Sequence, residues 1–279
     1  MNNAFPIYPF FYKKIQVYIV FLFLFENILS RVLTVPGEHI PTISTAIFEA
    51  QFNDTILVMP GIYKENIELK PGLVIFSKEL FGAVIDGKGR GDVVKLSYNS
   101  IISGFAIRNG NTGVVSTRHA GNGITKCKIY KNRGSGIICT GDMPKIENNI
   151  IIYNEGSGIQ ALYINSGSTS INHNTISFNG NYGVIFKGKL TLTIENNIIT
   201  SNGSSGYKLE LEDKNTKITH NLFYGNHQFK FILPDNNFSF DPLFIAPKKK
   251  ILNFGLQSMS KAIKKGNDNF NLGARFTNN

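Results

Sequence analysis

Charged side chains recur at one place in successive repeats of the second half of the chain. Segments that follow a glycine can be aligned on Ile159, Val184, Tyr207 and Phe229. Alternation along a strand turns these residues inward and their neighbours outward. Lysines in a row can hold an anionic sugar chain, and a Lys or Glu can act as a base. The sequence therefore predicts a substrate-binding set: Gln160, Lys187, Lys208, Glu210 and Lys230. A solvated, salt-bridged strand face explains the same spacing, and both interpretations stay open.

The elements that must position these side chains belong to a repeat of about two dozen residues. Four similar phrases occupy 146–154, 171–179, 194–202 and 218–226. Their first aligned asparagines are Asn149, Asn174, Asn197 and Asn221, and their last are Asn154, Asn179, Asn202 and Asn226. The last position extends backwards to Asn132 and Asn109. A fixed period with short Ile-rich runs predicts an all-β fold, a right-handed parallel β-helix.

The recurrent asparagines and glycines have a structural explanation. Asn tolerates the left-handed conformation at a corner, and stacked amides can form hydrogen-bonded ladders. The glycine bends lack the lysine and the strand–loop–helix context of a phosphate loop. Near the start, residues 41–52 place Ile43, Ala46, Ile47 and Ala50 on one helical face. This pattern predicts a short N-terminal capping helix, because a solenoid needs covered ends.

The flanks of the repeat carry a family resemblance. The segments 35–47, 53–63, 65–69, 84–89 and 102–110 follow one another in the order seen in pectin-lyase-like right-handed β-helix proteins of bacteria, which the chain resembles after residue 33. The segments 240–244, 256–258 and 271–274 resemble the closing part of such proteins. The resemblance implies a secreted β-helix. It does not imply one activity, because the superfamily includes lyases, hydrolases, epimerases and adhesins.

The chemistry of those relatives does not map onto this chain. No aspartate cluster on successive coils suggests a calcium-dependent lyase, and Asn-Thr-Asp and Asp-Asp signatures are missing. Asp86 and Asp142 are interpreted as turn residues. His173 and His220 share a column two coils apart, about 10 Å, too far for a shared metal. No cofactor is evident, although calcium stays open. A third interpretation is a resemblance to the periplasmic β-helix accessory protein for copper delivery to nitrous oxide reductase. The chain has only four methionines and scattered histidines, which argues against copper binding.

Composition bounds the compartment and the partners. Residues 1–30 contain Lys13 and Lys14 before an apolar run and predict a signal peptide too short to span a bilayer. Residues 31–240 then form the β-helix and 241–279 a closing segment, with the Phe-rich stretch 229–244 covering the end of the coil. Cys127 and Cys139 could form one disulfide bridge or remain buried free thiols, and buried thiols are the preferred interpretation. The net charge of +10 favours acidic partners. Nucleic acid is not expected among them, because the sequence contains no recognised nucleic-acid-binding fold.

Together these features predict a secreted, cell-surface or periplasmic monomer that binds an extracellular, acidic polysaccharide. The sequence does not decide whether it also acts as a lyase or hydrolase. A noncatalytic, adhesin-like surface protein is the alternative.

Overall fold

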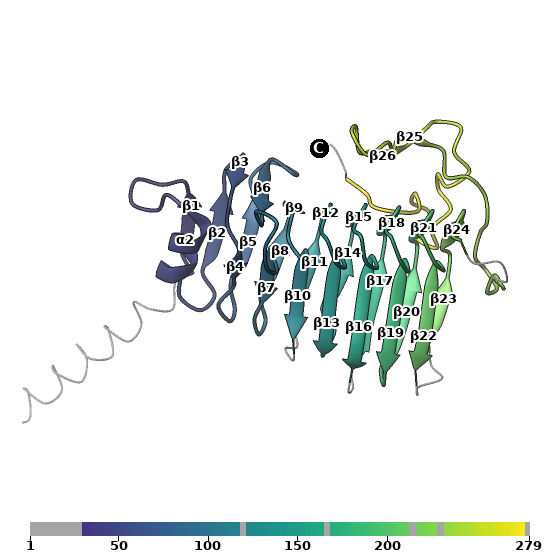
Figure 1. Ribbon diagram of the computed structural model, residues 1–279, viewed down its shortest axis with the longest axis horizontal. Helices are drawn as coiled ribbons and strands as arrows, with labels where there is room; N and C mark the ends of the chain where they lie inside the picture. The colour runs from purple at the N-terminus through teal and green to yellow at the C-terminus, as the bar shows by residue number, and fades with distance from the viewer. Residues whose placement is uncertain (1–29, 118–120, 165–167, 212–215, 228–231, 277–279) are drawn as a thin grey trace, which may run out of the picture. The chain divides into compact units, whose positions relative to one another are not determined.

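Short parallel strands follow one another from Val32 to Tyr224 and stack coil upon coil, as Figure 1 shows. This computed structural model of the 279-residue chain describes residues 30–117, 121–164, 168–211, 216–227 and 232–276. The right-handed parallel β-helix predicted from the repeat is confirmed. The signal-peptide prediction concerns residues 1–30, and 1–29 lie outside the described residues.

Three parallel sheets make up the coil. Sheet 1 contains β1 (Val32–Val35), β2 (Thr55–Val58), β5 (Val74–Ser77), β8 (Ile101–Ser103), β11 (Gly123–Thr125), β14 (Lys145–Glu147), β17 (Ser168–Asn172), β20 (Thr191–Glu195) and β23 (Lys217–Thr219). Sheet 2 contains β4 (Ile67–Glu68), β7 (Val94–Leu96), β10 (Val114–Thr117), β13 (Ile137–Gly141), β16 (Ile159–Ile164), β19 (Val184–Gly188) and β22 (Tyr207–Leu211). Sheet 3 contains β3 (Gly61–Tyr63), β6 (Ala83–Asp86), β9 (Ala106–Arg108), β12 (Lys128–Tyr130), β15 (Ile150–Ile152), β18 (Thr175–Ser177), β21 (Ile198–Thr200) and β24 (Leu222–Tyr224).

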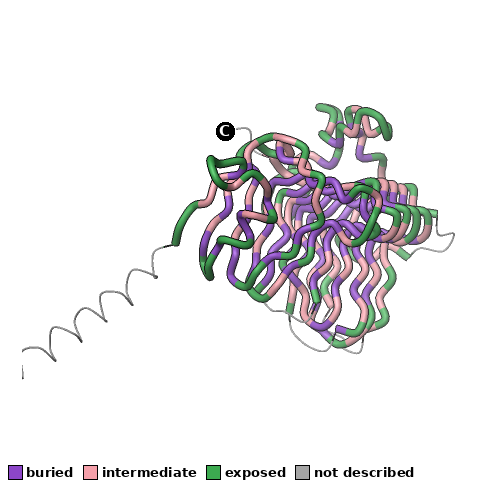
Figure 2. Tube along the Cα trace, turned by 60° about the vertical axis from the view of Figure 1, so that its left-hand side comes forward, coloured by how far each residue is buried: buried purple, intermediate pink, exposed green. Residues whose placement is uncertain are grey.

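The core is filled by the inward side chain of each short strand. In sheet 3, the register stacks one isoleucine above another and fully buries the column Ile85, Ile107, Ile129, Ile151, Ile176 and Ile199. Figure 2 shows the same alternation of buried and less buried residues along successive coils. No coil could bury this surface alone, so the stacking of neighbours creates the core.

Two asparagine ladders run along the coil, as predicted. The Nδ2 group of each asparagine donates to the Oδ1 atom of the next at 2.9–3.1 Å, in the order Asn149, Asn174, Asn197, Asn221 and Asn237. The second ladder runs through Asn132, Asn154, Asn179, Asn202 and Asn226 at 2.9–3.1 Å. These buried amides also bond to strand carbonyls, so they satisfy the backbone at the corners.

The extension of the second ladder to Asn109 is wrong by one residue. The amide of Gly110, not that of Asn109, donates to Asn132 Oδ1 at 3.0 Å. Asn109 has a φ of 58° and its Nδ2 group donates to Asp86 Oδ1 at 2.9 Å. The side chain of Asn109 therefore leaves the ladder because a carboxylate on the preceding coil binds it.

The first end of the coil is covered by the predicted helix, α2 (Ile43–Glu49). Thr42 caps it by accepting a hydrogen bond from the Thr45 amide at 3.0 Å. The side chains of Ile43, Ala46, Ile47 and Ala50 are buried, as their helical spacing predicts. This arrangement confirms the amphipathic cap, although α2 is shorter than the predicted range.

The chain after Phe240 lies along the side of the coil. Part of the Phe-rich stretch expected to cover the end, 228–231, lies outside the described residues, and Phe238 pairs with Leu222 as one more piece of coil. The following segment, with the antiparallel pair β25 (Phe244–Ala246) and β26 (Asn253–Leu256), then turns back over sheet 3 (Figure 1). We call residues 241–276 the C-terminal strap.

Apolar side chains on the outer face of sheet 3 explain where the strap lies. The outer residues Ile150, Ile152, Ile198 and Leu222 form a second hydrophobic cluster with Phe244, Phe254, Ala262 and Leu272 of the strap. Tyr153 stacks on Phe178 with ring centroids 5.0 Å apart, and Phe254 contacts both rings edge-on. The strap thus removes from water an apolar face that a bare β-helix would expose.

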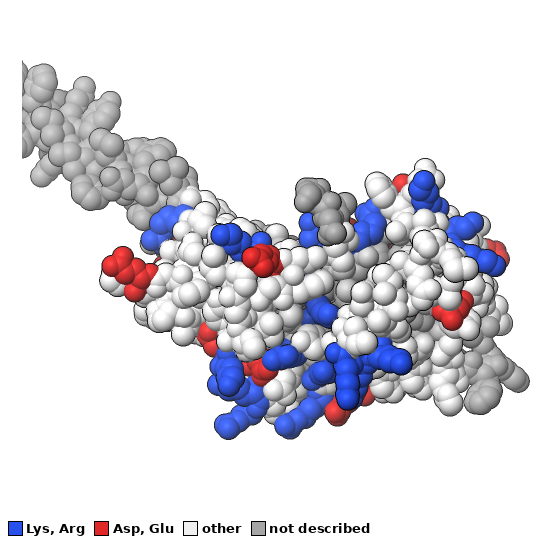
Figure 3. Space-filling model, turned by 90° about the horizontal axis from the view of Figure 1, so that it is seen from above, with Lys and Arg blue, Asp and Glu red and all other residues white. Residues whose placement is uncertain are grey.

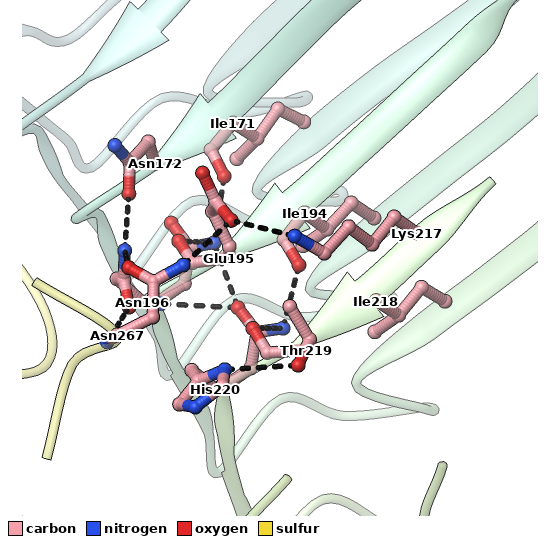
Figure 4. Close-up of polar contacts among 12 residues, drawn as sticks. Ile171, Asn172, Ile194, Glu195, Asn196, Lys217, Ile218, Thr219, His220 and Asn267 are labelled. Carbon is pink, nitrogen blue, oxygen red and sulfur yellow. Dashed lines mark hydrogen bonds and ion pairs between the residues drawn. The ribbon is translucent and has the colours of Figure 1, made fainter. Parts of the chain in front are cut away.

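Polar contacts hold the strap in register. Asn267 donates to Glu195 Oε2 and accepts from Asn196 Nδ2, at 2.9 and 2.8 Å, as Figure 4 shows. Asp268 Oδ2 lies 2.8 Å from His173 Nε2 and 3.3 Å from Arg275 Nη1. His173 is therefore a latch between the coil and the strap, because its side chain is only 1% exposed.

We expect the strap to loosen as the pH falls from 7 to 5. Burial and the Arg275 charge lower the pKa of His173, although the Asp268 contact opposes this shift. The released state binds a proton near pH 6.5 and the latched state only at lower pH, so stability present above pH 6.5 is lost as the pH falls toward the latched-state pKa. The exchange of the Gly273 amide, bonded to Asn196 O at 2.8 Å, measures this opening after correction for intrinsic exchange.

The control for the latch is His173→Gln, which keeps a polar group and removes the titration. Its amide exchange at Gly273 is expected to show no extra opening between pH 7 and 5. An equal pH dependence in the original protein and in the variant would assign the opening to another group.

Both cysteines are buried free thiols, as the sequence analysis preferred. Burial raises the pKa of Cys127 to about 12 and raises that of Cys139 as well. The Cys127 amide donates to Asn149 Oδ1 at 2.9 Å, so Cys127 occupies the ladder position before Asn149, as its alignment predicted. No helix within the described ranges is long and apolar enough to cross a membrane.

Candidate functional site

The register of sheet 2 brings together three members of the predicted set. Gln160 pairs with Ile185 and Ile185 with Lys208, while Lys187 pairs with Glu210, as the alignment predicted. Lys208 Nζ lies 2.8 Å from Glu210 Oε1 and Lys187 Nζ lies 3.7 Å from Glu210 Oε2. Hydrogen bonding to Lys208 lowers the pKa of Glu210. The carboxylate is thus ionised and shared by two exposed lysines.

The remaining members of the predicted set lie apart from these ion pairs. Gln160 Oε1 accepts a hydrogen bond from Ser135 Oγ at 2.9 Å, and Lys230 lies outside the described residues. A hollow of about 380 Å³ beside Lys208 is lined by Tyr182, Gly203, Ser204, Ser205, Tyr207 and His227. The face offers one net positive charge from its three charged side chains, so the substrate-binding role stays a prediction.

A denser group of cations lies on the outer face of sheet 3. The register pairs Asp86 with Arg108 and Arg108 with Tyr130 on three successive coils. Arg108 Nε donates to Asp86 Oδ2 at 2.9 Å, and Arg108 Nη1 donates to Tyr130 Oη at 3.3 Å. These contacts hold the Arg108 guanidinium group between Asp86 on the preceding coil and Tyr130 on the following coil.

Two lysines complete the group around the same phenol ring. Lys128 Nζ lies 5.9 Å and Lys131 Nζ 5.8 Å from the ring centroid of Tyr130. Lys128 Nζ also lies 5.6 Å from the Phe81 ring, where the electron-rich faces of both rings attract the ammonium group. Burial and the charge of Lys131 lower the pKa of Lys128. We call Arg108, Lys128 and Lys131 around Tyr130 the basic cluster.

Within the described residues, the carboxylate bonded to the basic cluster is that of Asp86, and it already has several partners. Asp86 accepts hydrogen bonds from the Lys88 amide, Asn109 Nδ2 and Arg108 Nε at 2.9–3.0 Å. Burial raises the pKa of Asp86, but these bonds outweigh it and the net shift is downward. Asp86 is therefore a fixed anion that orients Arg108, and three of its acceptor sites are already used.

Basic side chains are also abundant on the wider surface. Seen from above in Figure 3, Lys and Arg gather along one edge of the coil and outnumber Asp and Glu there. Arg133 extends the positive surface beside the cluster, because its Nη2 atom lies 2.8 Å from the place that a Cβ atom on Gly89 would occupy. The surface thus attracts anions before they reach the cluster.

The basic cluster was not predicted from the sequence, because only the strands that follow the glycine bends were aligned. The signal lies in the strands after each corner asparagine. Aligning β6, β9 and β12 on their inner isoleucines places Asp86, Arg108 and Tyr130 in one outward column. The same strands place Lys128 in the other outward column, next to Ala106.

The strap and the basic cluster adjoin on the outer face of sheet 3. Apolar residues of β15, β21 and β24 lie under the strap, and Ala106 and Tyr130 belong to the same buried cluster. The charged outer side chains of β6, β9 and β12 are Asp86, Arg108 and Lys128. The two parts meet where Phe276 contacts Phe81 edge-on, with ring centroids 5.0 Å apart. The strap therefore ends beside the ring that supports Lys128.

Fold and site together define a parallel β-helix protein with an outward-facing cluster of cationic side chains. Among solved structures, it is similar to a mannuronic acid-specific polysaccharide family 6 lyase from human gut microbiota, with TM-score 0.49 and 14% identity over 70% of this chain. It covers 54% of that enzyme, about half of its length. It is also similar to pectate lyase Pel9A, with TM-score 0.47 and 13% identity over 91% of this chain and 98% of that one.

A pectin methylesterase in complex with a hexasaccharide is a more distant likeness, with TM-score 0.34 and 11% identity over 75% of this chain and 92% of that one. No curated protein sequence matches. Residues 50–239, more than half of the chain, match the family described as periplasmic copper-binding protein (NosD). The protein belongs to this family.

Proposed function

We propose that the protein binds an acidic polysaccharide outside the cytoplasm, with the basic cluster as its principal contact surface. The observation that carries the proposal is the meeting of Arg108, Lys128 and Lys131 around one phenol ring, with a single carboxylate that is already bonded. Such a surface has positive charge to offer and an aromatic ring nearby. Sugars and their acidic groups use these two features together.

A long ligand suits the geometry of the coil. Neighbouring parallel strands lie about 4.8 Å apart, so side chains on successive coils form a row with that spacing. The cluster takes Arg108 from β9 and Lys128 from β12, and Arg133 lies beyond it. A polymer that crosses these two coils contacts Arg108 on one and Lys128 on the next, which strengthens binding without a deep pocket.

The family supports a location outside the cytoplasm. Its description names a periplasmic protein, and the chain begins with the basic and apolar pattern of a signal peptide. Envelope and matrix polysaccharides are the acidic polymers found there. Binding without chemistry is the function proposed, because the Asp86 carboxylate is occupied and Glu210 is shared by two lysines.

The copper in the family description has no fitting donor set in the described part of the chain. No three His, Cys, Asp or Glu side chains come together there in a way that could hold a metal ion. Cys127 and Cys139 are fully buried, and His173 binds Asp268 through Nε2. Copper favours clustered thiolate, thioether or imidazole groups, so no step of the proposed function is assigned to it.

Binding of polygalacturonate, measured by calorimetry with the absorbance of unsaturated products followed in parallel, tests the proposal. The double variant Lys128→Gln and Lys131→Gln is expected to weaken binding at least about tenfold. The matched control, Lys145→Gln with Lys217→Gln, removes the same charge from exposed lysines paired with Glu147 and Glu195 and should bind within about twofold.

Three results would change the proposal. Equal losses in both double variants would mean that net charge, and not the cluster, attracts the polymer. A loss confined to Lys187→Gln with Lys208→Gln would move the surface to sheet 2. Absence of binding to any acidic polymer would favour a noncatalytic structural or adhesin-like protein.

A further inference from the structure

The basic cluster has more positive charge than one carboxylate can neutralise. Arg108, Lys128 and Lys131 supply three positive charges, and Asp86 supplies one negative charge. Two positive charges therefore remain around a single phenol ring. A uronate sugar brings one negative charge per residue, so a single uronate group leaves one of these positive charges without a partner.

Among the residues that the structure describes, no ion pair joins Lys128 or Lys131 to a carboxylate. Phe81 and Phe276 are the rings on the strap side, and Lys126 lies with Phe276 at a hollow of about 450 Å³ next to them. Lys128 is half-buried, and its pKa is lowered by burial and by Lys131. A partly dehydrated ammonium group next to a second one gains most from an anion with more than one charge.

We propose that the basic cluster receives a phosphate monoester carried by a sugar of the bound polysaccharide. A phosphate monoester carries about 1.5 to 2 negative charges at pH 7 and has three acceptor oxygens, which matches the remaining charge and the three cations. This inference rests on the proposed function and names the acidic group that the cluster recognises.

Arg108 has the geometry that a phosphate group requires. Asp86 holds its Nε and Tyr130 receives a hydrogen bond from Nη1, so the fork is fixed before a ligand arrives. Nη2 has no bond to Asp86 or Tyr130, so one of its N–H groups and the second N–H of Nη1 can form the paired bonds that guanidinium makes with phosphate oxygens. Lys128 and Lys131 flank Tyr130 in the sequence and act as point charges.

The pH dependence separates phosphate from the protein's own groups. The second pKa of a phosphate monoester is about 6, so the ligand loses one charge between pH 7 and 5. Asp86 stays ionised there because its hydrogen bonds lower its pKa against the effect of burial, and contacts with Tyr130 and Asp86 raise the pKa of Arg108. Weaker binding at pH 5 therefore reports the ligand.

Calorimetry with matched single sugars tests the inference. Glucose 6-phosphate is expected to bind at least about fivefold more tightly than galacturonate at pH 7, and this preference should shrink to about twofold at pH 5. Lys131→Gln, at an exposed position, should remove most of the preference while Lys145→Gln keeps it. Inorganic phosphate should compete with glucose 6-phosphate.

Equal affinity for the two sugars, or a preference that Lys131→Gln leaves intact, would overturn the inference. Tighter binding to phosphatidylcholine vesicles that contain phosphatidic acid would assign the phosphate to a lipid headgroup and would also overturn it. Polygalacturonate binding is measured in the same series. If the polymer binds and the phosphate preference is absent, the proposed function stands and only the phosphate assignment fails.

Discussion

Replacing Asn197 with alanine is expected to lower the free energy of unfolding by about 3–5 kcal/mol. The side chain is fully buried and joins three coils. Its Nδ2 group donates to Ile171 O, Glu195 O and Asn221 Oδ1 at 2.8–2.9 Å. Its Oδ1 atom accepts from the amide and the Nδ2 group of Asn174 at 2.8 and 3.1 Å. Alanine removes these bonds and leaves buried donors and acceptors without the Asn197 partner.

The measurement is the urea midpoint of unfolding, followed by far-ultraviolet circular dichroism. Asn111→Ala is the matched control, because Asn111 is an exposed asparagine in the bend between β9 and β10. Its midpoint should change by an amount equivalent to less than about 0.5 kcal/mol. Similar small changes in both variants would show that the ladder contributes regularity but little stability.

The sequence was sufficient for the architecture because a repeat states the same information several times. Each copy of the phrase around Asn149, Asn174, Asn197 and Asn221 places a corner, an inner isoleucine and a bend at fixed offsets. An error in one copy is corrected by the others. The cap was predictable for a different reason: the helical spacing of Ile43, Ala46 and Ile47 has no role in a strand.

Where the repeat is broken, the sequence alone was less reliable. At Asn109, composition suggests the ladder, but Asp86 on the preceding coil binds the amide and Gly110 takes the ladder position. The strap was harder still, since His173 and Asp268 are 95 residues apart and no pattern links them. Such contacts depend on which side of the coil the chain returns over, and this is decided by the outer apolar residues of sheet 3.

The candidate site shows the same division between register and chemistry. The alignment of Lys187, Lys208 and Glu210 was predictable because glycine bends mark the start of each strand. Whether two lysines share one carboxylate depends on side-chain geometry that spacing does not contain. The basic cluster needed the register of a second sheet and the position of Phe81, a turn residue with a φ of 61° that supports Lys128.

The second large effect is expected from Gly158→Ala, which should lower the free energy of unfolding by about 2–3 kcal/mol. Gly158 precedes β16 in a column of glycines where coils approach closely. A Cβ atom there would lie 2.4 Å from Ile176 Cγ2 and 2.6 Å from Gly183 O, and 3.0 Å from the ladder amide of Asn179. The next coil must move away, which separates β15 from β18 in sheet 3 and β16 from β19 in sheet 2.

The control is Gly123→Ala, whose added methyl group makes ordinary contact with Ile101 at 3.4 Å. Urea midpoints compare the two variants, and equal values would mean that the coils can shift at little cost and that the glycine column does not set their spacing.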